Sequence, residues 1–278
     1  MEGEKMYKKI VETADFIKRK IGDIKPNYLV IMGSGLKDAI PELEDIKTLS
    51  YSEIPNFPLP SVKGHIGELI YGRFKDRNLV IMRGRFHYYE GYSITFLSFP
   101  IRLFNYLGVT KLLVTAAVGS LKRSIKPGDI IILSDHINLM NTNPLIGNYH
   151  EKFGEMFVDM SEPYKKAAIK EIEDIMKKRK MRVKKGVYVA VSGPCYETEA
   201  EARMYRMIGG DVIGMSVVPE VISARQLRMD VFGVCWVSNY VAGIGNMAIS
   251  HDDVIKMGNE VGKKIKLIIE TVILCDRF

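Results

Sequence analysis

The sequence predicts a single α/β domain, residues 1–278, with a central mixed, largely parallel β-sheet flanked by helices. Short apolar runs typical of buried strands alternate with segments whose apolar residues recur every three or four positions, as in helices. No linker rich in Pro, Gly or Ser, no low-complexity segment and no internal repeat divides the chain. With 47% hydrophobic residues, a chain of 278 residues has ample material for one core.

In the first half of the chain, apolar residues at helical spacing predict helices over residues 6–21 and 93–107. Apolar runs predict strands at 28–32, 69–72, 79–82 and 111–115. Several prolines make residues 47–62 a loop-rich connection. The small residues 116–120 predict a tight turn directly after the fourth of these strands.

In the second half, residues 126–129 predict a turn, because they read Lys-Pro-Gly-Asp. Apolar runs predict strands at 130–133, 186–191 and 231–237. Helical spacing predicts helices over 162–180 and 199–208, and a last helix through 254–272. Strands and helices therefore alternate to the end of the chain.

Composition excludes several classes of protein. No apolar run is long enough to span a membrane. Residues 1–5 lack the apolar region of a signal peptide, so we expect a cytoplasmic protein. Cys195, Cys235 and Cys275 form no C-x-x-C pair and are expected to be reduced. The five histidines show no metal-ligand spacing with cysteines or carboxylates, so no metal site is expected.

The net charge of +7 is partly concentrated in the basic run 177–180. No aromatic residue is interleaved there, and the run ends a predicted amphipathic helix, where lysines complement the helix dipole. We therefore interpret it as a solvated helix end and expect no nucleic-acid partner. The surplus positive charge still favours anionic substrates.

The segment 83–92 follows an apolar run and delivers four kinds of polar side chain to a strand end, from Arg85, His87, Tyr89 and Glu90. Ligands of open α/β sheets bind outside the carboxyl ends of strands. Arginine with histidine suits a multiply charged oxyanion such as phosphate, because the guanidinium fork matches two oxygens at once. Tyrosine and glutamate suit a sugar hydroxyl or proton transfer. The alternative is a solvated loop with one buried salt bridge.

The turn Gly33-Ser34-Gly35 also follows a predicted strand and can present N–H groups and a hydroxyl to an anion at a helix N-terminus. It lacks the third glycine of a dinucleotide fingerprint and the Lys-Ser/Thr pair of a P-loop. Together with Arg85 and His87, Ser34 becomes a candidate phosphate cradle. His65, in Gly-His-Ile-Gly, is by itself interpreted as a loop histidine bonded to backbone.

Three later segments suit a flat heterocycle. Glu197 is either the first-turn carboxylate of the next helix or an acceptor for the N–H groups of a ring that packs against Tyr196. Met215 suits an apolar wall beside such a ligand, with Ser216 next to it. Asn239 both donates and accepts, so it can read a purine edge, or else it caps a turn or helix.

Taken together, these segments resemble the purine nucleoside phosphorylase family of the low-molecular-mass, trimeric type. The matching pieces occur in the family's order and cover nearly the whole chain, so the ordered set is specific although each piece alone is weak. They are 33–36, 51–58, 64–67, 84–92, 127–130, 135–138, 193–198, 214–220 and 238–239.

The resemblance implies a sheet that is partly barrel-like and an enzyme of purine salvage, a pentosyltransferase. Purine ribonucleosides and deoxyribonucleosides such as inosine and guanosine would react with phosphate to give the free base and (deoxy)ribose 1-phosphate. Phosphate would be a co-substrate, and no cofactor would be needed. The chemistry requires no covalent enzyme intermediate, which agrees with the lack of a credible nucleophilic triad.

Carried over by motif, the implied phosphate residues are Ser34, Arg85, His87, Ala117 and Ser216, with His65 beside them. The implied ribose residues are Tyr89, Met215 and His251, together with Phe153 contributed by a neighbouring subunit of a homotrimer. The implied purine residues are Glu197, Asn239 and Tyr196. The expected catalytic residues are His87, Glu197 and Asn239.

One departure from the family pattern keeps an alternative open. Residues 115–120 read Thr-Ala-Ala-Val-Gly-Ser where the family usually has Thr-Asn-Ala-Ala-Gly-Gly, which leans toward the related methylthioadenosine phosphorylases. Glu197, Asn239 and His251 favour 6-oxopurine nucleosides with a 5′-hydroxyl. A purine-binding protein without catalysis and a phosphate-independent hydrolase are less favoured, because Arg85 and His87 are retained and the phosphate cradle looks complete.

Overall fold

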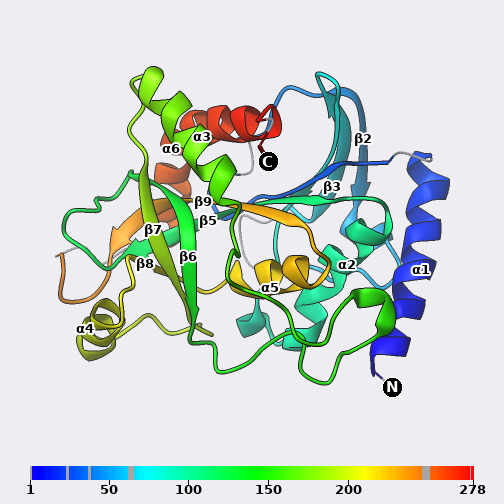
Figure 1. The fold of residues 1–278 in the computed structure, drawn as a ribbon, viewed down its shortest axis with the longest axis horizontal. Coiled ribbons are helices and arrows are strands. Elements are labelled where there is room, and N and C mark those ends of the chain that lie inside the picture. Colours follow the sequence, from blue (N-terminus) through cyan, green and yellow to red (C-terminus); the bar gives the residue numbers. More distant parts are fainter. Residues whose placement is uncertain (1, 23–24, 37–38, 62–65, 246–250, 276) are drawn as a thin grey trace.

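The computed structural model describes residues 2–22, 25–36, 39–61, 66–245, 251–275 and 277–278, without the side chains at 251–256, 259 and 260. In these ranges a nine-stranded sheet lies at the centre, with α-helices packed around it (Figure 1). The strands are β1 (Tyr28–Ile31), β2 (Glu44–Ser50), β3 (Glu68–Phe74), β4 (Arg77–Arg83), β5 (Lys111–Ser120), β6 (Ile130–Asn138), β7 (Lys184–Ala190), β8 (Val212–Gly214) and β9 (Asp230–Tyr240). The α-helices are α1 (Glu2–Ile21), α2 (Phe99–Tyr106), α3 (Lys166–Lys178), α4 (Glu199–Met207), α5 (Val218–Gln226) and α6 (His251–Ile273).

The sheet is mixed and partly closed. Its strand order is β2-β3-β4-β1-β5-β8-β7-β6-β9, and β9 also pairs with β5. This pairing closes β5, β8, β7, β6 and β9 into a ring, from which β1, β4, β3 and β2 extend as an open sheet. The strands β4, β1, β5 and β9 are mutually parallel where they pair, so their carboxyl ends meet at one edge. The predicted mixed, partly barrel-like sheet is confirmed.

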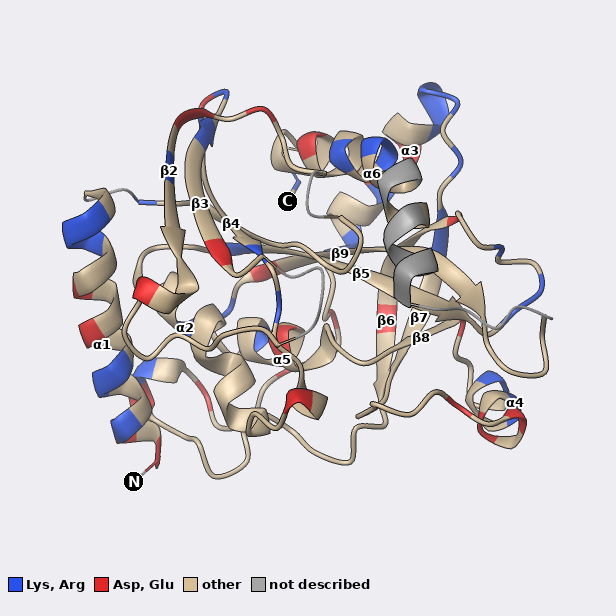
Figure 2. Cartoon of the chain, turned by 180° about the vertical axis from the view of Figure 1, so that it is seen from behind, with Lys and Arg blue, Asp and Glu red and all other residues tan. Residues whose placement is uncertain are grey.

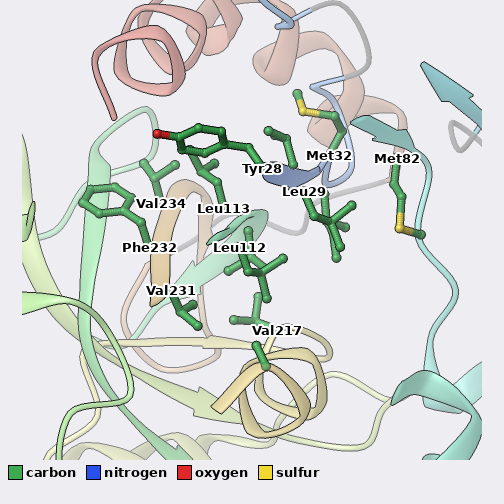
Figure 3. Close-up of a cluster of buried hydrophobic side chains, with 14 of the residues drawn as sticks. Tyr28, Leu29, Met32, Met82, Leu112, Leu113, Val217, Val231, Phe232 and Val234 are labelled. Atoms are coloured by element: carbon green, nitrogen blue, oxygen red, sulfur yellow. The ribbon is translucent and has the colours of Figure 1, made fainter. Parts of the chain in front are cut away.

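The central strands are apolar because helices or further strands cover both of their faces. All four residues of β1 are buried. Tyr28 and Leu29 of this strand belong to one cluster with Leu112 of β5 and Phe232 of β9 (Figure 3). The Tyr28 hydroxyl donates to the backbone oxygen of Ile273 at 3.0 Å, which ties the end of α6 to the sheet.

The amphipathic helices pack as predicted. In α1, the face formed by Ile10, Ala14, Ile17 and Ile21 is buried. The predicted helix 93–107 is a 3-10 turn, Ile94–Ser98, followed by α2. Pro100 lies in the first turn of α2, where its missing N–H has no intrahelical partner to lose.

The predicted turn at 116–120 is wrong, because β5 continues through Ser120. Residues 116–120 pair with β9, and Gly119 and Ser120 also pair with β8. The small side chains allow close approach of neighbouring elements: a Cβ on Gly119 would lie 3.0 Å from Val241 and 3.2 Å from Ile213. Small residues here serve sheet packing rather than chain reversal.

Three elements were not predicted. In β2 only Leu49 is buried, so the strand shows no apolar run. The strand β8 is three residues long and lies within the segment linking α4 and α5. In α5 all residues except Arg225 are buried, so no helical periodicity marks it in the sequence.

The surface carries charges of both signs and one exposed cysteine. Lys and Arg on α1, α3 and α6 are interspersed with Asp and Glu (Figure 2). The basic run 177–180 is exposed at the end of α3. All three cysteines are free, with Cys195 exposed. No helix in the described ranges is both long and apolar enough to cross a membrane.

Candidate active site

One cavity collects most of the predicted site residues at the carboxyl edge of the sheet. It encloses about 160 Å³. Ten of the predicted residues line it: Ser34, Arg85, His87, Tyr89, Ala117, Tyr196, Glu197, Met215, Ser216 and Asn239. They follow or end six different strands, β1, β4, β5, β7, β8 and β9. Strand ends that are distant in sequence therefore converge on one site, as the topology requires.

Arg85 is the buried cation of this cavity, with 2% of its side chain exposed. Its Nε and Nη2 donate to the two carboxylate oxygens of Glu220, at 2.7 and 2.9 Å. Its Nη1 donates to the backbone oxygen of Thr115 at 2.8 Å. Burial disfavours the charged form, but the Glu220 carboxylate outweighs this and raises the pKa of Arg85. The guanidinium therefore stays charged, and one fork that was expected to face phosphate is bound to Glu220.

His87 and Tyr89 stack beside Arg85, with ring centroids 4.6 Å apart. Burial lowers the pKa of His87, with a hydrogen bond to Glu90 opposing it. Burial and the nearby Glu90 carboxylate raise the pKa of Tyr89 to about 12. Near pH 7 the cavity therefore presents a neutral imidazole and a neutral phenol.

The turn after β1 carries Ser34 against β5. Gly33 N–H donates to the Thr115 hydroxyl at 2.8 Å, and this hydroxyl donates to the Ile31 backbone oxygen at 3.1 Å. A Cβ on Gly33 would lie 2.6 Å from the Thr115 backbone oxygen, so only glycine allows this approach. Residues 33–36 form a turn and not a helix start, so the expected helix N-terminus at Ser34 is wrong.

Ser216 is held at a sharp turn between β8 and α5. Its N–H donates to the hydroxyl of Tyr188 at 3.2 Å, and its Oγ accepts from Nη1 of Arg85 at 3.4 Å. Val217 has φ 66 and ψ −57, and Val218 N–H donates to the Ser216 backbone oxygen at 2.7 Å. A β-branched residue rarely adopts a positive φ, so surrounding contacts impose this turn.

Glu197 is not a first-turn helix carboxylate. The helix α4 begins at Glu199, and its capping box is formed by Thr198 and Glu201. Glu197 therefore precedes the cap and lines the cavity instead. Burial raises the pKa of its carboxyl group. Next to it, Tyr196 is 67% exposed, which leaves its ring accessible to a ligand.

Asn239 is neither a helix cap nor a turn residue, because it lies near the end of β9. Its Oδ1 accepts from the Ser238 hydroxyl at 2.6 Å, and its Nδ2 donates to the Tyr240 backbone oxygen at 3.0 Å. These bonds assign the orientation of the amide. The second N–H of Nδ2 and the second lone pair of Oδ1 add donor and acceptor capacity at this end of β9.

Three predicted residues are not placed in the cavity. His65 lies outside the described residues, as does the side chain of His251. Phe153 is 3% exposed and is enclosed by its own chain. The guanidinium of Arg102 lies 4.0 Å from its ring centroid, and Tyr7 packs against its edge. The expectation that Phe153 reaches a neighbouring subunit is therefore wrong.

Sequence reasoning gave no role to several lining residues. Val118, Val191 and Ile213 supply an apolar wall. Val191 ends a predicted strand, whereas Val118 falls in the predicted turn and Ile213 in the unpredicted strand β8. The sequence marks Glu220 only as the last residue of the segment 214–220 that matches the family. Within the described part of the chain, no group of three or more His, Cys, Asp or Glu side chains is arranged to hold a metal ion.

The site thus combines a buried guanidinium, an imidazole and two serine hydroxyls with a carboxylate and an amide in one partly apolar cavity. The chain matches the family model described as "Phosphorylase superfamily" over residues 27–274. It is 47% identical over 252 residues to purine nucleoside phosphorylase 1 of Geobacillus stearothermophilus, covering 91% of this chain and 92% of that protein.

Solved structures of purine nucleoside phosphorylases have the same fold as this chain. Schistosoma mansoni purine nucleoside phosphorylase in complex with adenosine has a TM-score of 0.89 at 38% identity and covers 96% of both chains. A complex of that enzyme with inosine has a TM-score of 0.88 at 38% identity, covering 96% of this chain and 95% of that one. Fold and site therefore define a nucleoside-processing α/β enzyme. The chain belongs to the phosphorylase superfamily, among its purine nucleoside phosphorylases.

Proposed function

We propose that this enzyme cleaves 6-oxopurine nucleosides, inosine and guanosine and their deoxy forms, with phosphate as the second substrate. The observation that carries the proposal is one cavity lined by Ser34, Arg85, His87 and Ser216 and also by Glu197 and Asn239. The first set suits a phosphate, and the second suits the polar edge of a purine. An α/β enzyme that holds both in one cavity can bring phosphate against the glycosidic bond.

Charge development during the reaction explains the residue types. Breaking the glycosidic bond builds positive charge on the ribose and negative charge on the leaving purine. The bound phosphate stabilises the ribose charge, and Asn239 donates to the purine as its charge develops. Glu197 accepts from the N1–H of a 6-oxopurine and orients the base. Nothing in this scheme requires a cofactor.

The remaining predicted residues complete the proposal. Ala117 contributes its backbone to the phosphate site. His65, which lies outside the described residues, is assigned to phosphate by the family resemblance alone. Tyr89 binds the 3′-hydroxyl, Met215 contacts the ribose face and His251 binds the 5′-hydroxyl. The placement of Tyr89 and Met215 in the cavity supports their part in this assignment. Tyr196 covers the purine ring, which agrees with its exposed position.

We further propose a homotrimer in which Phe157, rather than Phe153, reaches a neighbouring site. Phe157 is 87% exposed and Met156 beside it is 55% exposed, whereas Phe153 is buried. An exposed large aromatic side chain next to other exposed apolar residues is typical of an interface. The unpaired state of all three cysteines supports a reducing, cytoplasmic location.

Cleavage of methylthioadenosine is the second candidate, and one observation favours it. Ala116 and Val118, two of the three residues in 115–120 that depart from the family pattern, line the cavity. The relatives named above are purine nucleoside phosphorylases and do not favour this alternative.

The test measures base release from inosine, guanosine, adenosine and methylthioadenosine, each with and without phosphate. We expect phosphate-dependent release from inosine and guanosine. Greater release from methylthioadenosine would contradict the assignment of Glu197 and Asn239. Release without phosphate would contradict the role of Ser34, Arg85 and His87.

A further inference from the structure

The carboxylate of Glu220 is the direct partner of the cation in the anion site. Its two oxygens accept from Nε and Nη2 of Arg85 at 2.7 and 2.9 Å, which makes a bidentate pair. The side chains of Arg85 and Glu220 are 2% and 11% exposed. Two parallel hydrogen bonds fix the plane of a guanidinium as well as its position.

A single short segment holds Arg85 through different nitrogens. Ser216 Oγ accepts from Nη1 at 3.4 Å, while Glu220 binds Nε and Nη2. The turn at Val217 separates these two residues, and Glu220 lies in the first turn of α5. The backbone oxygen of Thr115 on β5 completes the set by accepting from Nη1 at 2.8 Å. Hydrogen bonds to β5 and to the start of α5 therefore hold Arg85 between these two elements.

This arrangement changes what Arg85 does for an anion. Because Glu220 occupies the Nε and Nη2 fork, phosphate and Glu220 do not share the same face of the guanidinium. The edge toward Ser216 lies at the cavity, since both residues line it. Without the carboxylate, the long arginine side chain would have other rotamers available, and its desolvated charge would lose the only oppositely charged group that the described contacts give it.

We infer that Glu220 is a positioning residue for phosphate, which holds the guanidinium of Arg85 with its Ser216 edge toward the anion. The inference rests on the proposed function, in which the cavity takes phosphate beside Arg85. It makes a specific claim about kinetics: loss of Glu220 weakens the use of phosphate and leaves nucleoside binding nearly unchanged.

The first variants are Glu220→Gln and Glu220→Asp. For Glu220→Gln we expect the KM for phosphate to rise about tenfold or more, the scale of one lost charged hydrogen bond. The KM for inosine should stay within about twofold, because uniform binding of the nucleoside is untouched. Glu220→Asp keeps the charge on a shorter side chain and should restore part of the phosphate affinity. An unchanged phosphate KM in Glu220→Gln overturns the inference.

A matched control separates positioning from general stability. Glu68 pairs with Arg83 at the end of β4, where the two side chains are 24% and 19% exposed, and neither lines the cavity. Glu68→Gln removes an Arg–Glu pair of the same kind without touching the phosphate site. We expect a lower melting temperature with an unchanged phosphate KM. A rise in phosphate KM equal to that of Glu220→Gln would reduce Glu220 to a structural role.

A double-mutant cycle covers the case in which Glu220→Gln alone folds poorly. Arg85→Gln combined with Glu220→Gln replaces the ion pair by a neutral pair, which avoids an uncompensated buried charge. If Glu220 acts through Arg85, Glu220→Gln adds nothing to the phosphate KM in the Arg85→Gln background. Additive effects overturn the inference. An Arg85→Gln variant with normal phosphate KM contradicts the proposed phosphate site itself, which distinguishes the two failures.

Discussion

Nδ1 of His87 lies 2.8 Å from Oε1 of Glu90, and the same oxygen accepts from the backbone N–H of His87 at 2.7 Å. The other oxygen of Glu90 accepts from the N–H and the hydroxyl of Ser61, both at 2.6 Å. An ionised carboxylate only accepts, so Nδ1 of His87 carries its proton. Glu90 thereby sets both the orientation and the tautomer of this imidazole, which lines the cavity.

Glu90→Gln should make stability less dependent on pH. Burial tends to raise the pKa of Glu90, but hydrogen bonds from His87 and Ser61 lower it to about 2. A carboxylate with a depressed pKa stabilises the fold above its ordinary pKa, here 4.5, and loses this contribution as the pH falls toward 2. The unfolding free energies of wild type and Glu90→Gln should therefore differ most at pH 7 and converge below about pH 4.5. Urea denaturation across this range measures the difference, and a gap that is constant with pH would contradict an ionised Glu90.

Glu197→Gln should impair inosine cleavage selectively. Loss of a charged acceptor at the base costs about 2–3 kcal/mol, or roughly 30- to 150-fold in kcat/KM for inosine. The KM for phosphate should not change. Glu201→Gln is the matched control, because Glu201 caps α4 and does not line the cavity. Equal losses in both variants would assign Glu197 a role in folding instead of base recognition.

The raised pKa of Glu197 leads to a prediction of how activity depends on pH. Burial raises the pKa of Glu197 above its ordinary value, so the acceptor is protonated earlier on acidification. We expect kcat/KM for inosine to fall as the pH drops through this raised pKa, since the protonated form loses acceptor capacity. In Glu197→Gln this acidic limb should disappear. A limb that persists in the variant would belong to another group.

Phe153 and Phe157 should respond to truncation in opposite ways. Phe153→Ala removes a buried ring that packs on Arg102, and should cost about 3–5 kcal/mol of stability. Phe157→Ala should change the unfolding free energy by less than about 0.5 kcal/mol, because the ring is exposed in the single chain. It should raise the KM for inosine about tenfold if the ring covers a neighbouring site. Chemical denaturation and steady-state kinetics on both variants decide the assignment.

At position 217 we expect the glycine variant to be more stable than the alanine variant, which is the reverse of the usual order. Its φ of 66 is strained for any residue with a Cβ, whereas glycine adopts it without cost. Val217→Ala and Val217→Gly remove nearly the same buried volume, so their difference reports backbone strain. We expect the glycine variant to be more stable by about 1 kcal/mol. A more stable alanine variant would mean that the surrounding packing, and not the turn, governs this position.

Ten of the predicted site residues line one cavity because apolar runs mark where the central strands end. Arg85, Glu197 and Asn239 were identified as polar residues following such runs, and parallel neighbours place those ends together. The hydrogen-bond partners of these residues could not be predicted from the sequence, because a partner can be far away along the chain. Glu220, for example, is 135 positions from Arg85. Periodicity reports which face of an element is buried, not which distant side chain covers it.

The incorrect predictions share this origin. Phe153 and Phe157 stand four residues apart in one connecting segment. Contacts with distant residues, among them Arg102 on α2 and Tyr7 on α1, bury Phe153 and not Phe157. Likewise, the small residues 116–120 indicate a turn when considered alone. In the structure they are the part of β5 where two other strands approach closely.

The outermost strand of the open sheet has a consequence for how copies of this protein can meet. Among the described residues the strand β2 pairs with β3 alone, so its other side is an unpaired edge there. Glu44, Asp45 and Lys47 are exposed along it, and the register shifts between Glu44 and Lys47, with Asp45 at φ 54. Charges and a bulge make such an edge a poor template for another strand. Edge-to-edge pairing of strands from two copies, a route by which many sheet proteins aggregate, is therefore disfavoured at this edge.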